Sequence, residues 1–335
     1  MQIQKVQWGV LSTARIAVRK VIPAMQKGEW TQVVAIASRD RRKAEDAARA
    51  LSISRAYGSY DELLADPEID AVYIPLPNHL HVPWTLKAAK AGKHVLCEKP
   101  LSLTADEARR LLTIRDQAGV KIGEAFMVRV HPQWLFAREL IRSGSIGKLR
   151  SIVGYFSYFN RDASNIRNVR EYGGGALMDI GCYPIHVSRY MFGEEPLRVM
   201  GLVERDLTFQ VDSLTSAVLE FPSGQSIFTC STQLTYYQKM HFLGTKGRIE
   251  IEIPFNAPND RPCRIFIDDG KAGSNGGVTE KSFPVCDQYT LQGDAFSKAI
   301  RGKGEIPVSL EDSVGNMSVI EAVFRSADSG KWEKP

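Results

Sequence analysis

Short apolar runs alternate with amphipathic segments along the first 123 residues. The apolar runs have the length and composition of buried β-strands; they are Val6–Leu11, Val33–Ala37, Ala71–Ile74, His94–Cys97 and Lys121–Gly123. The segments between them repeat apolar residues at helical spacing; they are Ile16–Gln26, Arg41–Leu51, Pro83–Ala91 and Ala105–Ala118. Gly92 and Gly119 follow two of these segments, as glycines at helix C-termini do. The alternation predicts a doubly wound parallel sheet, so residues 1–123 are expected to form an α/β domain.

The pattern changes after residue 123 to one helix followed by longer β-rich runs. The helix is expected at Trp134–Ser143, and the runs expected to pair antiparallel are Leu149–Phe159, Leu197–Glu204, Asp212–Phe221 and Gln225–Thr232. Shorter runs extend the sheet at Lys239–Leu243, Arg248–Ile253 and Arg264–Ile267. The glycine-rich stretch Asp269–Thr279 predicts a surface loop, and Ser309–Ala327 predicts a closing amphipathic helix. Residues 124–335 are therefore expected to form an α+β domain with a large, predominantly antiparallel open sheet.

The size and composition of the chain agree with a two-domain enzyme. The 335 residues exceed what one hydrophobic core usually holds. Hydrophobic residues make up 44% and charged residues 24%, which gives no case for disorder, and no stretch approaches the roughly 20 apolar residues of a membrane span. Met1–Trp8 lacks the apolar region of a secretion signal, so a cytoplasmic location is expected.

Charge and cysteine content exclude two further classes. The net charge of +5 comes from 43 basic and 38 acidic residues, with one dense basic cluster at Arg39–Lys43. No nucleic-acid module accompanies it, so nucleic-acid binding is not expected, while anionic ligands stay open. The five cysteines include no CxxC pair, which suits neither a disulfide framework nor a zinc site. Reduced thiols and no metal are expected.

The first predicted strand leads into a turn with mostly small side chains. A Rossmann unit has its glycine-rich turn here and points a helix N-terminus at a pyrophosphate. Ser12, Ala14 and Ala17 stand where the glycines of GxGxxG would be, so the motif itself is absent, but small side chains still allow a close backbone approach. The segment is either a dinucleotide-binding turn or an ordinary tight turn from strand to helix.

The end of the second predicted strand carries Ser38 and Arg39, where a carboxylate would bind the ribose of NAD. A hydroxyl and a guanidinium suit a 2′-phosphate, which favours NADP. Asp40 is a plausible N-cap of the next helix, and Arg41 to Lys43 would then oppose the helix dipole unless a phosphate binds. The alternatives are a solvated helix start, and NAD with Asp40 near the ribose.

Two further segments end predicted parallel strands, Pro75–His81 and Glu98–Pro100. The carboxyl ends of strands line the ligand crevice of a doubly wound sheet. Pro100 restricts Lys99 to an extended backbone, and Glu98 gives it a carboxylate neighbour, so the ammonium is expected at a defined place. An ordinary surface lysine is the alternative.

A second cluster of polar residues follows three glycines at 173–175. Asp179, Tyr183 and His186 recur at i, i+4 and i+7, so they share one face of a helix. The glycines allow close approach of another backbone or a ligand. The alternative is a capped, solvated helix start.

Together these segments resemble the glucose-fructose oxidoreductase and inositol dehydrogenase (Gfo/Idh/MocA) family over nearly the whole chain. The segments are Trp8–Ala17, Pro75–His81, Glu98–Pro100, Glu124–Arg129 and Gly173–Tyr183. The resemblance favours the branch of NADP-dependent xylose (aldose) and dihydrodiol dehydrogenases. Inositol dehydrogenases have histidine where this chain has Tyr183, and Asn168-Val169-Arg170 resembles the Asn-Ile-Arg of that branch. The substrate is then expected to be a sugar or a cyclic diol.

The resemblance also implies roles for individual residues. Lys99 would be the catalytic lysine on the nicotinamide side, Asp179 the substrate-binding aspartate and Tyr183 the acid/base residue. The residues expected to bind the cofactor are Ser12, Thr13, Ala14, Arg15, Ile16, Ser38, Arg39, Lys43, Pro75, Leu76, Asn78, His81, Glu98 and Lys99. The residues expected to bind the substrate are Arg129, Phe156, Asn160, Asp179 and Tyr183, with His131 and Tyr155 placed by position only. His131 is alternatively a satisfied core histidine, and the role of His186 stays open.

In the expected reaction Tyr183 takes the proton of a sugar hydroxyl while hydride passes from the anomeric carbon to the nicotinamide. A nearby Lys99 ammonium would lower the pKa of the tyrosine toward the working pH. A trans-dihydrodiol dehydrogenase, a sugar–sugar oxidoreductase that keeps its NADP, and an NADP-binding sensor without chemistry are the alternatives. An open sheet face and the family both predict a homodimer or homotetramer.

Overall fold

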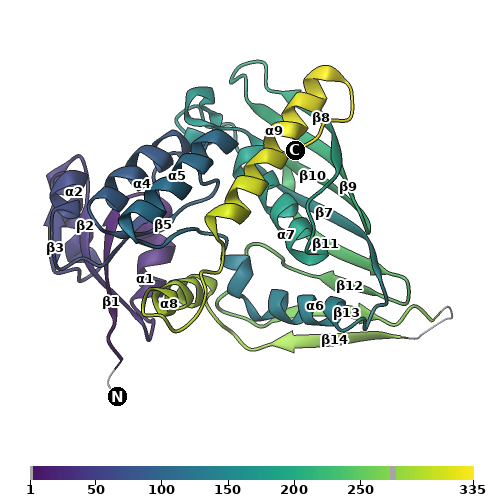
Figure 1. Ribbon diagram of the computed structural model, residues 1–335, viewed down its shortest axis with the longest axis horizontal. Coiled ribbons are helices and arrows are strands. Elements are labelled where there is room, and N and C mark those ends of the chain that lie inside the picture. Colours follow the sequence, from purple (N-terminus) through teal and green to yellow (C-terminus); the bar gives the residue numbers. More distant parts are fainter. Residues whose placement is uncertain (1–2, 272–276) are drawn as a thin grey trace. The chain divides into compact units, whose positions relative to one another are not determined.

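The computed structural model describes residues 3–271 and 277–335 (Figure 1). Its first sheet has six parallel strands in the order β3-β2-β1-β4-β5-β6. The strands are β1 (Val6–Leu11), β2 (Thr31–Ala37), β3 (Arg55–Tyr57), β4 (Ala71–Ile74), β5 (His94–Cys97) and β6 (Ile122–Glu124). β1, β4 and β5 have the bounds that the apolar runs predict, and the predicted Rossmann architecture is confirmed.

Helices cover both faces of this sheet. They are η1 (Ala17–Val21), α1 (Ile22–Met25), α2 (Arg41–Ala50), α3 (Tyr60–Leu64), η2 (Asn78–Leu80), α4 (His81–Lys90), α5 (Ala105–Ala118), η3 (Met127–Val130) and α8 (Gln288–Ile300). One apolar cluster joins Leu11 and Val72 to α3, α4 and α5. The other joins Trp8 and Val10 to α1, α2 and α8. Successive residues of a strand point to opposite faces, which is why Val10 and Leu11 belong to different clusters.

The second sheet has eight strands in the order β14-β13-β12-β11-β7-β10-β9-β8. They are β7 (Leu149–Phe159), β8 (Arg198–Arg205), β9 (Asp212–Phe221), β10 (Gly224–Ser231), β11 (Gln233–Gly244), β12 (Arg248–Ile251), β13 (Cys263–Asp268) and β14 (Val278–Phe283). All neighbouring pairs are antiparallel except β7 and β10, which are parallel. The expectation that the β-rich runs pair antiparallel is therefore wrong for β7 and β10. The long connection between them, which contains helices, makes a parallel pairing feasible.

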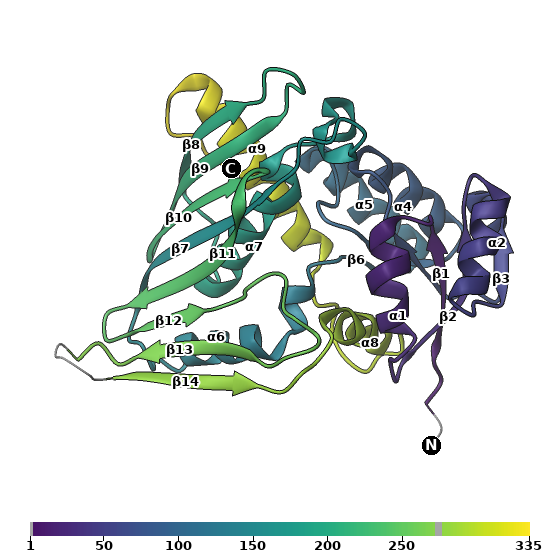
Figure 2. The same ribbon diagram turned by 180° about the vertical axis from the view of Figure 1, so that it is seen from behind.

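One face of the second sheet is covered by helices and the other is open (Figure 2). The remaining helices are α6 (Pro132–Arg142), η4 (Ile166–Asn168), η5 (Arg170–Tyr172), η6 (Leu177–Gly181), α7 (Cys182–Phe192) and α9 (Leu310–Ser329). On β7, Ile152, Gly154 and Phe156 are buried on the side of α7, whereas Tyr155 and Phe159 on the opposite side are exposed. The predicted α+β region with a predominantly antiparallel open sheet is confirmed.

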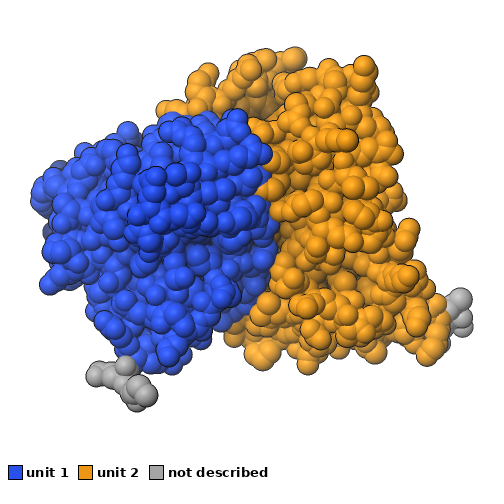
Figure 3. All heavy atoms as spheres, viewed as in Figure 1, with its two compact units in different colours: residues 1–130, 287–314 blue, residues 131–286, 315–335 orange. Residues whose placement is uncertain are grey.

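The chain divides into two compact units that do not follow one another simply in sequence (Figure 3). Unit 1 contains residues 1–130 and 287–314, and unit 2 contains residues 131–286 and 315–335. α8 therefore belongs with the first sheet. Of the predicted loop Asp269–Thr279, residues 272–276 lie outside the described part of the chain, and β14 already begins at Val278. The predicted boundary between residues 123 and 124 stays a prediction about domains.

Candidate active site

The turn after β1 has the backbone geometry of a glycine-rich turn although it contains no glycine. Ser12 has a φ of 132°, a conformation that residues with a Cβ rarely adopt. Its N–H donates to the Ala37 carbonyl of β2 (3.0 Å), and its hydroxyl accepts a hydrogen bond from the Ala14 N–H (3.0 Å). An uncommon conformation held by such contacts supports a dinucleotide-binding turn over an ordinary one.

The residues after β2 lie at the same edge of the sheet, since Leu11 of β1 pairs with Ala37 of β2. Asp40 caps α2, and its carboxylate accepts hydrogen bonds from the N–H groups of Arg42 (3.0 Å) and Lys43 (3.3 Å). The helix thus uses the carboxylate that NAD would need. The exposed Arg39 and the neighbouring Ser38 are left as groups that suit a 2′-phosphate.

Tyr60, which the sequence did not point to, links these two turns. Its phenol is buried at the start of α3, and burial raises its pKa, while side-chain hydrogen bonds with Ser12 and Arg39 oppose that shift. A protonated phenol between a hydroxyl and a guanidinium fixes the direction of the arginine. The residues at the ends of β1 and β2 therefore fit the adenosine side of NADP.

The ends of β4 and β5 lie side by side, since Ile74 pairs with Cys97. The Tyr73 hydroxyl donates a hydrogen bond to Glu98 Oε1 (2.6 Å), and the Glu98 N–H donates to the Ile74 carbonyl (3.1 Å). Burial, together with the charge of Glu98, raises the pKa of Tyr73 well above its usual value, so the phenol stays a donor. The half-buried Lys99 follows directly, and its peptide bond to Pro100 is cis. The predicted Pro75, Leu76, Asn78, Glu98 and Lys99 are thus brought to one sheet edge.

His81 is fully buried between the two loops that follow β4 and β5. Its Nδ1 lies 2.7 Å from the Pro100 carbonyl oxygen, and its Nε2 lies 2.7 Å from the Leu76 carbonyl oxygen. Burial lowers its pKa to about 4, so the ring is neutral at pH 7. Both polar atoms of the ring face protein carbonyls, which indicates that His81 joins the two loops; its expected contact with the cofactor stays a prediction.

Steric contacts within unit 2 explain two of the three glycines that precede Asp179. A Cβ on Gly174 would lie 2.4 Å from the Arg167 carbonyl oxygen. Gly175 has a φ of 114°, and a Cβ there would lie 1.9 Å from Asp212 Oδ1. The close approach expected from the glycines is therefore made by this chain's own backbone and by one carboxyl group.

That carboxyl group caps the helical segment that carries Asp179 and Tyr183. Asp212 is buried at the first position of β9, and its Oδ2 accepts hydrogen bonds from the Leu177 N–H (2.6 Å) and the Thr215 hydroxyl (3.0 Å). Burial raises its pKa to about 6. No sequence motif points to this residue, which reads only as an acid at the start of an apolar strand.

Asp179 is held by two side chains that the sequence did not point to. Tyr158 donates a hydrogen bond from its hydroxyl to Asp179 Oδ2 (2.6 Å), and Arg167 Nε lies 2.8 Å from the same oxygen. Burial raises the pKa of Tyr158, with the charge of Asp179 adding to it, so the phenol stays protonated. The aspartate is 8% exposed, which makes it a buried, oriented carboxylate rather than a solvated helix start.

Tyr183 is the second residue of α7 and lies inside an aromatic cluster. Its ring is 5% exposed and lies 5.8 Å from the ring of Phe156 and 5.2 Å from that of Phe255, between centroids. Phe156, expected to bind substrate, thus packs against the expected acid/base residue. Tyr155 lies on the opposite face of β7, because neighbouring residues of a strand alternate.

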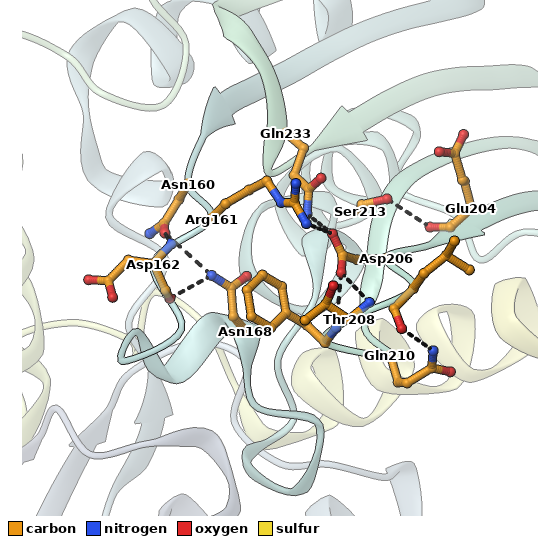
Figure 4. A network of polar contacts seen from close by, with 12 residues as sticks. Asn160, Arg161, Asp162, Asn168, Glu204, Asp206, Thr208, Gln210, Ser213 and Gln233 are labelled. Carbon is orange, nitrogen blue, oxygen red and sulfur yellow. Dashed lines mark hydrogen bonds and ion pairs between the residues drawn. The ribbon is translucent and has the colours of Figure 1, made fainter.

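Asn160 lies at the end of β7 in a polar network (Figure 4). Its side-chain oxygen accepts hydrogen bonds from the Asp162 N–H (2.9 Å) and from Asn168 Nδ2 (3.4 Å). Arg161, the next residue, pairs with the buried Asp206 (3.3 Å), which also accepts a hydrogen bond from Gln233 (2.8 Å). The network orients the amide of Asn160 with its NH₂ group as the remaining donor.

The other expected residues have protein partners of their own. In unit 1, Arg129 pairs with Asp312 of α9 (2.5 Å). In unit 2, His131 Nδ1 accepts a hydrogen bond from the Gln133 N–H (3.3 Å), and its Nε2 lies 3.4 Å from Cys286 Sγ. Burial lowers the pKa of His131 to about 4, as expected of a core histidine that caps α6. His186 is fully buried in α7.

The five cysteines are free thiols, four of them buried. Within the described part of the chain, no three His, Cys, Asp or Glu side chains are grouped so as to hold a metal ion. No helix among the described residues combines the length and hydrophobicity needed to cross a membrane.

A parallel sheet with a dinucleotide turn, together with a buried aspartate and tyrosine on one helical segment, defines an NAD(P)-dependent oxidoreductase. The chain belongs to the GFO/IDH/MocA oxidoreductase family. Residues 6–126 match the model of the oxidoreductase family with an NAD-binding Rossmann fold, and residues 134–250 match the GFO/IDH/MocA C-terminal domain.

Known relatives cover almost the whole chain. An uncharacterized oxidoreductase of Rhizobium meliloti is 49% identical, over 98% of both chains. A D-xylose 1-dehydrogenase (NADP(+)) of Haloferax volcanii is 40% identical, over 96% of this chain and 98% of its own. Among solved structures, an aldose-aldose oxidoreductase of Caulobacter crescentus in complex with glycerol has a TM-score of 0.91 at 27% identity, over 99% of this chain and all of its own. The chain is similar to enzymes whose substrates are sugars.

Proposed function

We propose that this enzyme transfers hydride between NADP and the anomeric carbon of an aldose, xylose- or glucose-like, with Tyr183 as the acid/base residue. The observation that carries the proposal is the buried pair Asp179 and Tyr183, one helical turn apart, with the carboxylate held by Tyr158 and Arg167. A carboxylate accepts hydrogen bonds from sugar hydroxyls, and a phenol exchanges a proton with one of them. The likeness to an NADP-dependent xylose dehydrogenase supports the aldose.

NADP, when bound, supplies the hydride acceptor and donor. The residues that would hold it are Ser12–Ile16 at the turn after β1, Ser38, Arg39 and Lys43 after β2, and Pro75, Leu76, Asn78 and Glu98 after β4 and β5. The uncommon backbone of Ser12 and the capping role of Asp40 support this assignment, because they leave a close-approach turn beside the exposed guanidinium of Arg39, which Tyr60 orients. NAD is the less favoured cofactor.

In the proposed reaction the Tyr183 oxygen takes the proton of the substrate's anomeric hydroxyl. Hydride leaves the carbon that carries this hydroxyl. Tyr183 must be a phenolate before it accepts this proton, and the Lys99 ammonium is assigned the role of favouring that form, because an opposite charge favours the ionised state. Asp179 accepts hydrogen bonds from substrate hydroxyls, and the NH₂ group of Asn160 donates to the substrate. Phe156 packs against Tyr183 and shields it from water. Arg129 is assigned to substrate only through its position after β6.

A sugar–sugar oxidoreductase that keeps its NADP bound is the second candidate. The solved aldose-aldose oxidoreductase, which covers 99% of this chain, favours it. A trans-dihydrodiol dehydrogenase would use the same residues on a cyclic diol. A regulator without chemistry is disfavoured, because Lys99, Asp179 and Tyr183 are all present.

A spectrophotometric panel tests the proposal. Aldoses, inositols and cyclic diols are each offered with NADP and with NAD, and reduction of the cofactor is followed at 340 nm. We expect an aldose to give the highest kcat/KM, and NADP to be preferred over NAD by about tenfold or more, because Arg39 binds phosphate with charge-assisted hydrogen bonds. Turnover of diols alone, or no turnover in a protein without bound cofactor, contradicts the proposal. Stoichiometric bound NADP with turnover only between two sugars identifies the second candidate.

We also propose that two copies of the chain meet through the open face of the second sheet. The strand pairing puts Leu202, Tyr155 and Ile227 on this face, and they are 74%, 44% and 39% exposed. Phe159 (67%) and Tyr237 (46%) extend it. Several exposed large apolar side chains on one sheet face support a protein interface there. A homodimer covers it, and a homotetramer adds a second contact.

A further inference from the structure

Asp212 is a buried carboxyl group that touches neither substrate nor cofactor in the proposed reaction. Its Oδ2 accepts hydrogen bonds from the Leu177 N–H (2.6 Å) and the Thr215 hydroxyl (3.0 Å). Its Oδ1 lies so close to Gly175 that a Cβ there would be 1.9 Å away. The group thus joins β9, the glycine turn and the first turn of η6.

The contact with Leu177 lies at the start of the segment that carries the two proposed catalytic residues. Asp179 follows in η6, and Tyr183 follows at the start of α7. An ionised carboxylate makes a hydrogen bond to a backbone N–H roughly twice as strong as a neutral acceptor does, and it suits the positive end of a helix. A weaker contact at Leu177 lets the whole segment shift.

We propose that Asp212 is a positioning residue of the reaction: its carboxylate anchors the first turn of η6 and thereby fixes the directions of Asp179 and Tyr183. The inference rests on the proposed function of those two residues. It adds a residue from a separate strand that acts through the helix and not on the substrate.

The charge of Asp212 makes this role depend on pH. Burial raises its pKa to about 6, while the hydrogen bonds from Leu177 and Thr215 and the charge of Arg205 on β8 oppose the shift. Cys230 of β10 also faces it and stays a neutral thiol, because burial raises the pKa of that thiol well above its usual value. The anchor is therefore ionised at pH 7.5 and protonated at pH 5.

The same shift fixes the sign of its effect on stability. The pKa in the fold lies above the ordinary value of 3.8, so the group stabilises the fold fully below pH 3.8, and this contribution is lost as pH rises through about 6. The ionised carboxylate of Asp212 thus lowers the stability of the fold at pH 7.5. Its presence is better accounted for by a role in the reaction than by a role in stability.

Asp212→Asn separates these two roles, because asparagine can still accept a hydrogen bond from the Leu177 N–H but carries no charge. With the sugar that the panel identifies, we expect kcat at pH 7.5 to fall about tenfold while NADP affinity is unchanged. We expect the thermal midpoint at pH 7.5 to be unchanged or raised. Wild-type kcat, or a lowered midpoint, overturns the inference.

Thr215→Val and Asp294→Asn provide the matched comparisons. In the wild-type protein the hydrogen bond from Thr215 lowers the pKa of Asp212. Valine removes this hydrogen bond and should therefore raise the pKa of Asp212. The acid limb of kcat should therefore move to higher pH in Thr215→Val and be absent in Asp212→Asn.

Asp294 also accepts two backbone hydrogen bonds, from Glu29 (3.0 Å) and Trp30 (2.8 Å), but it lies in unit 1. Asp294→Asn should keep the wild-type pH profile, and the same acid-limb changes in this variant overturn the inference.

Hydrogen exchange in the wild-type protein tests the anchor without any substrate. We expect the amides of residues 177–183 to exchange faster at pH 5 than at pH 7.5, after correction for intrinsic rates. Equal protection at both pH values overturns the inference, even if the panel confirms the sugar. A failed panel with the expected exchange leaves the anchor in place and rejects only the proposed reaction.

Discussion

At the scale of single residues, His81 shows how a buried side chain can join two loops of a site. A neutral imidazole carries one N–H, yet Nδ1 and Nε2 each lie 2.7 Å from a carbonyl oxygen, of Pro100 and Leu76 respectively. The Lys99 ammonium and His79 both disfavour a second proton on the ring, although burial is the larger effect. The neutral ring therefore donates a hydrogen bond to one of these carbonyls and packs against the other, so it lies between the loop after β4 and the residue that follows Lys99.

Two amide substitutions separate the contacts of His81. The side-chain amide of asparagine reaches the position of Nδ1, so His81→Asn keeps the contact with Pro100. The longer side chain of glutamine places its amide near the position of Nε2, so His81→Gln keeps the contact with Leu76. We expect His81→Gln to lose the Pro100 contact and lower kcat about tenfold, with NADP affinity within about twofold of wild type. His81→Asn should instead weaken NADP binding and keep kcat. Steady-state kinetics and NADP titration measure both quantities, and two variants with identical losses would contradict the division.

The sequence could identify Lys99, Asp179 and Tyr183 because they stand in local patterns, a strand end and a helical repeat. The catalytic and substrate-binding roles assigned to these three residues stay predictions. It could not identify Tyr158, Arg167 or Asp212, since each meets its partner across 12 to 35 residues of chain. Such contacts are set by the packing of strands and turns, and no local spacing encodes them.

At the scale of elements, burial decided which ones were predictable. β1 and β4 are buried almost throughout, so a continuous apolar run gave their bounds. β3 has only half-buried residues, and β14 is exposed except for Phe283, so neither shows the apolar pattern of a strand. The parallel pairing of β7 with β10 depends on the order of strands across the sheet, which apolar runs do not encode.

The helical segments that carry the proposed sites have an irregularity that sequence patterns do not reveal. η1 follows the nucleotide turn, and η6 contains Asp179; both are π-helical. Such segments often occur at functional sites, because they change the direction of side chains within one helix. The i, i+4 and i+7 spacing of Asp179, Tyr183 and His186 therefore describes their shared face only approximately.

At the scale of the whole molecule, chain order and compact units differ. Residues 287–314 return to unit 1, where Phe296 of α8 packs on Trp8 of β1 with ring centroids 5.8 Å apart. A division read along the sequence has no means of finding this contact, because its partners are nearly 300 residues apart. Family and fold class were nevertheless identifiable, since their motifs lie in short segments at strand ends.

The open face of the second sheet carries a prediction at this scale. We expect light scattering to give two or four times the 37.3 kDa of one chain. Ile227→Asp puts a charge on that face and should weaken the free energy of association by several kcal/mol, because burying an unpaired charge in an interface is costly. The assembly should then dissociate. The circular dichroism spectrum serves as the control for folding. A monomeric wild-type protein, or an unaffected variant, contradicts this interface.

In the proposed reaction Tyr183 exchanges the proton of a sugar hydroxyl during NADP-dependent hydride transfer. Single-turnover reduction of NADP at 340 nm by Tyr183→Phe tests this role, because phenylalanine keeps the ring beside Phe156 and removes only the hydroxyl. We expect a rate about 10²–10⁴ lower than wild type, with NADP affinity retained. Turnover of the variant at the wild-type rate would exclude Tyr183 as the acid/base residue.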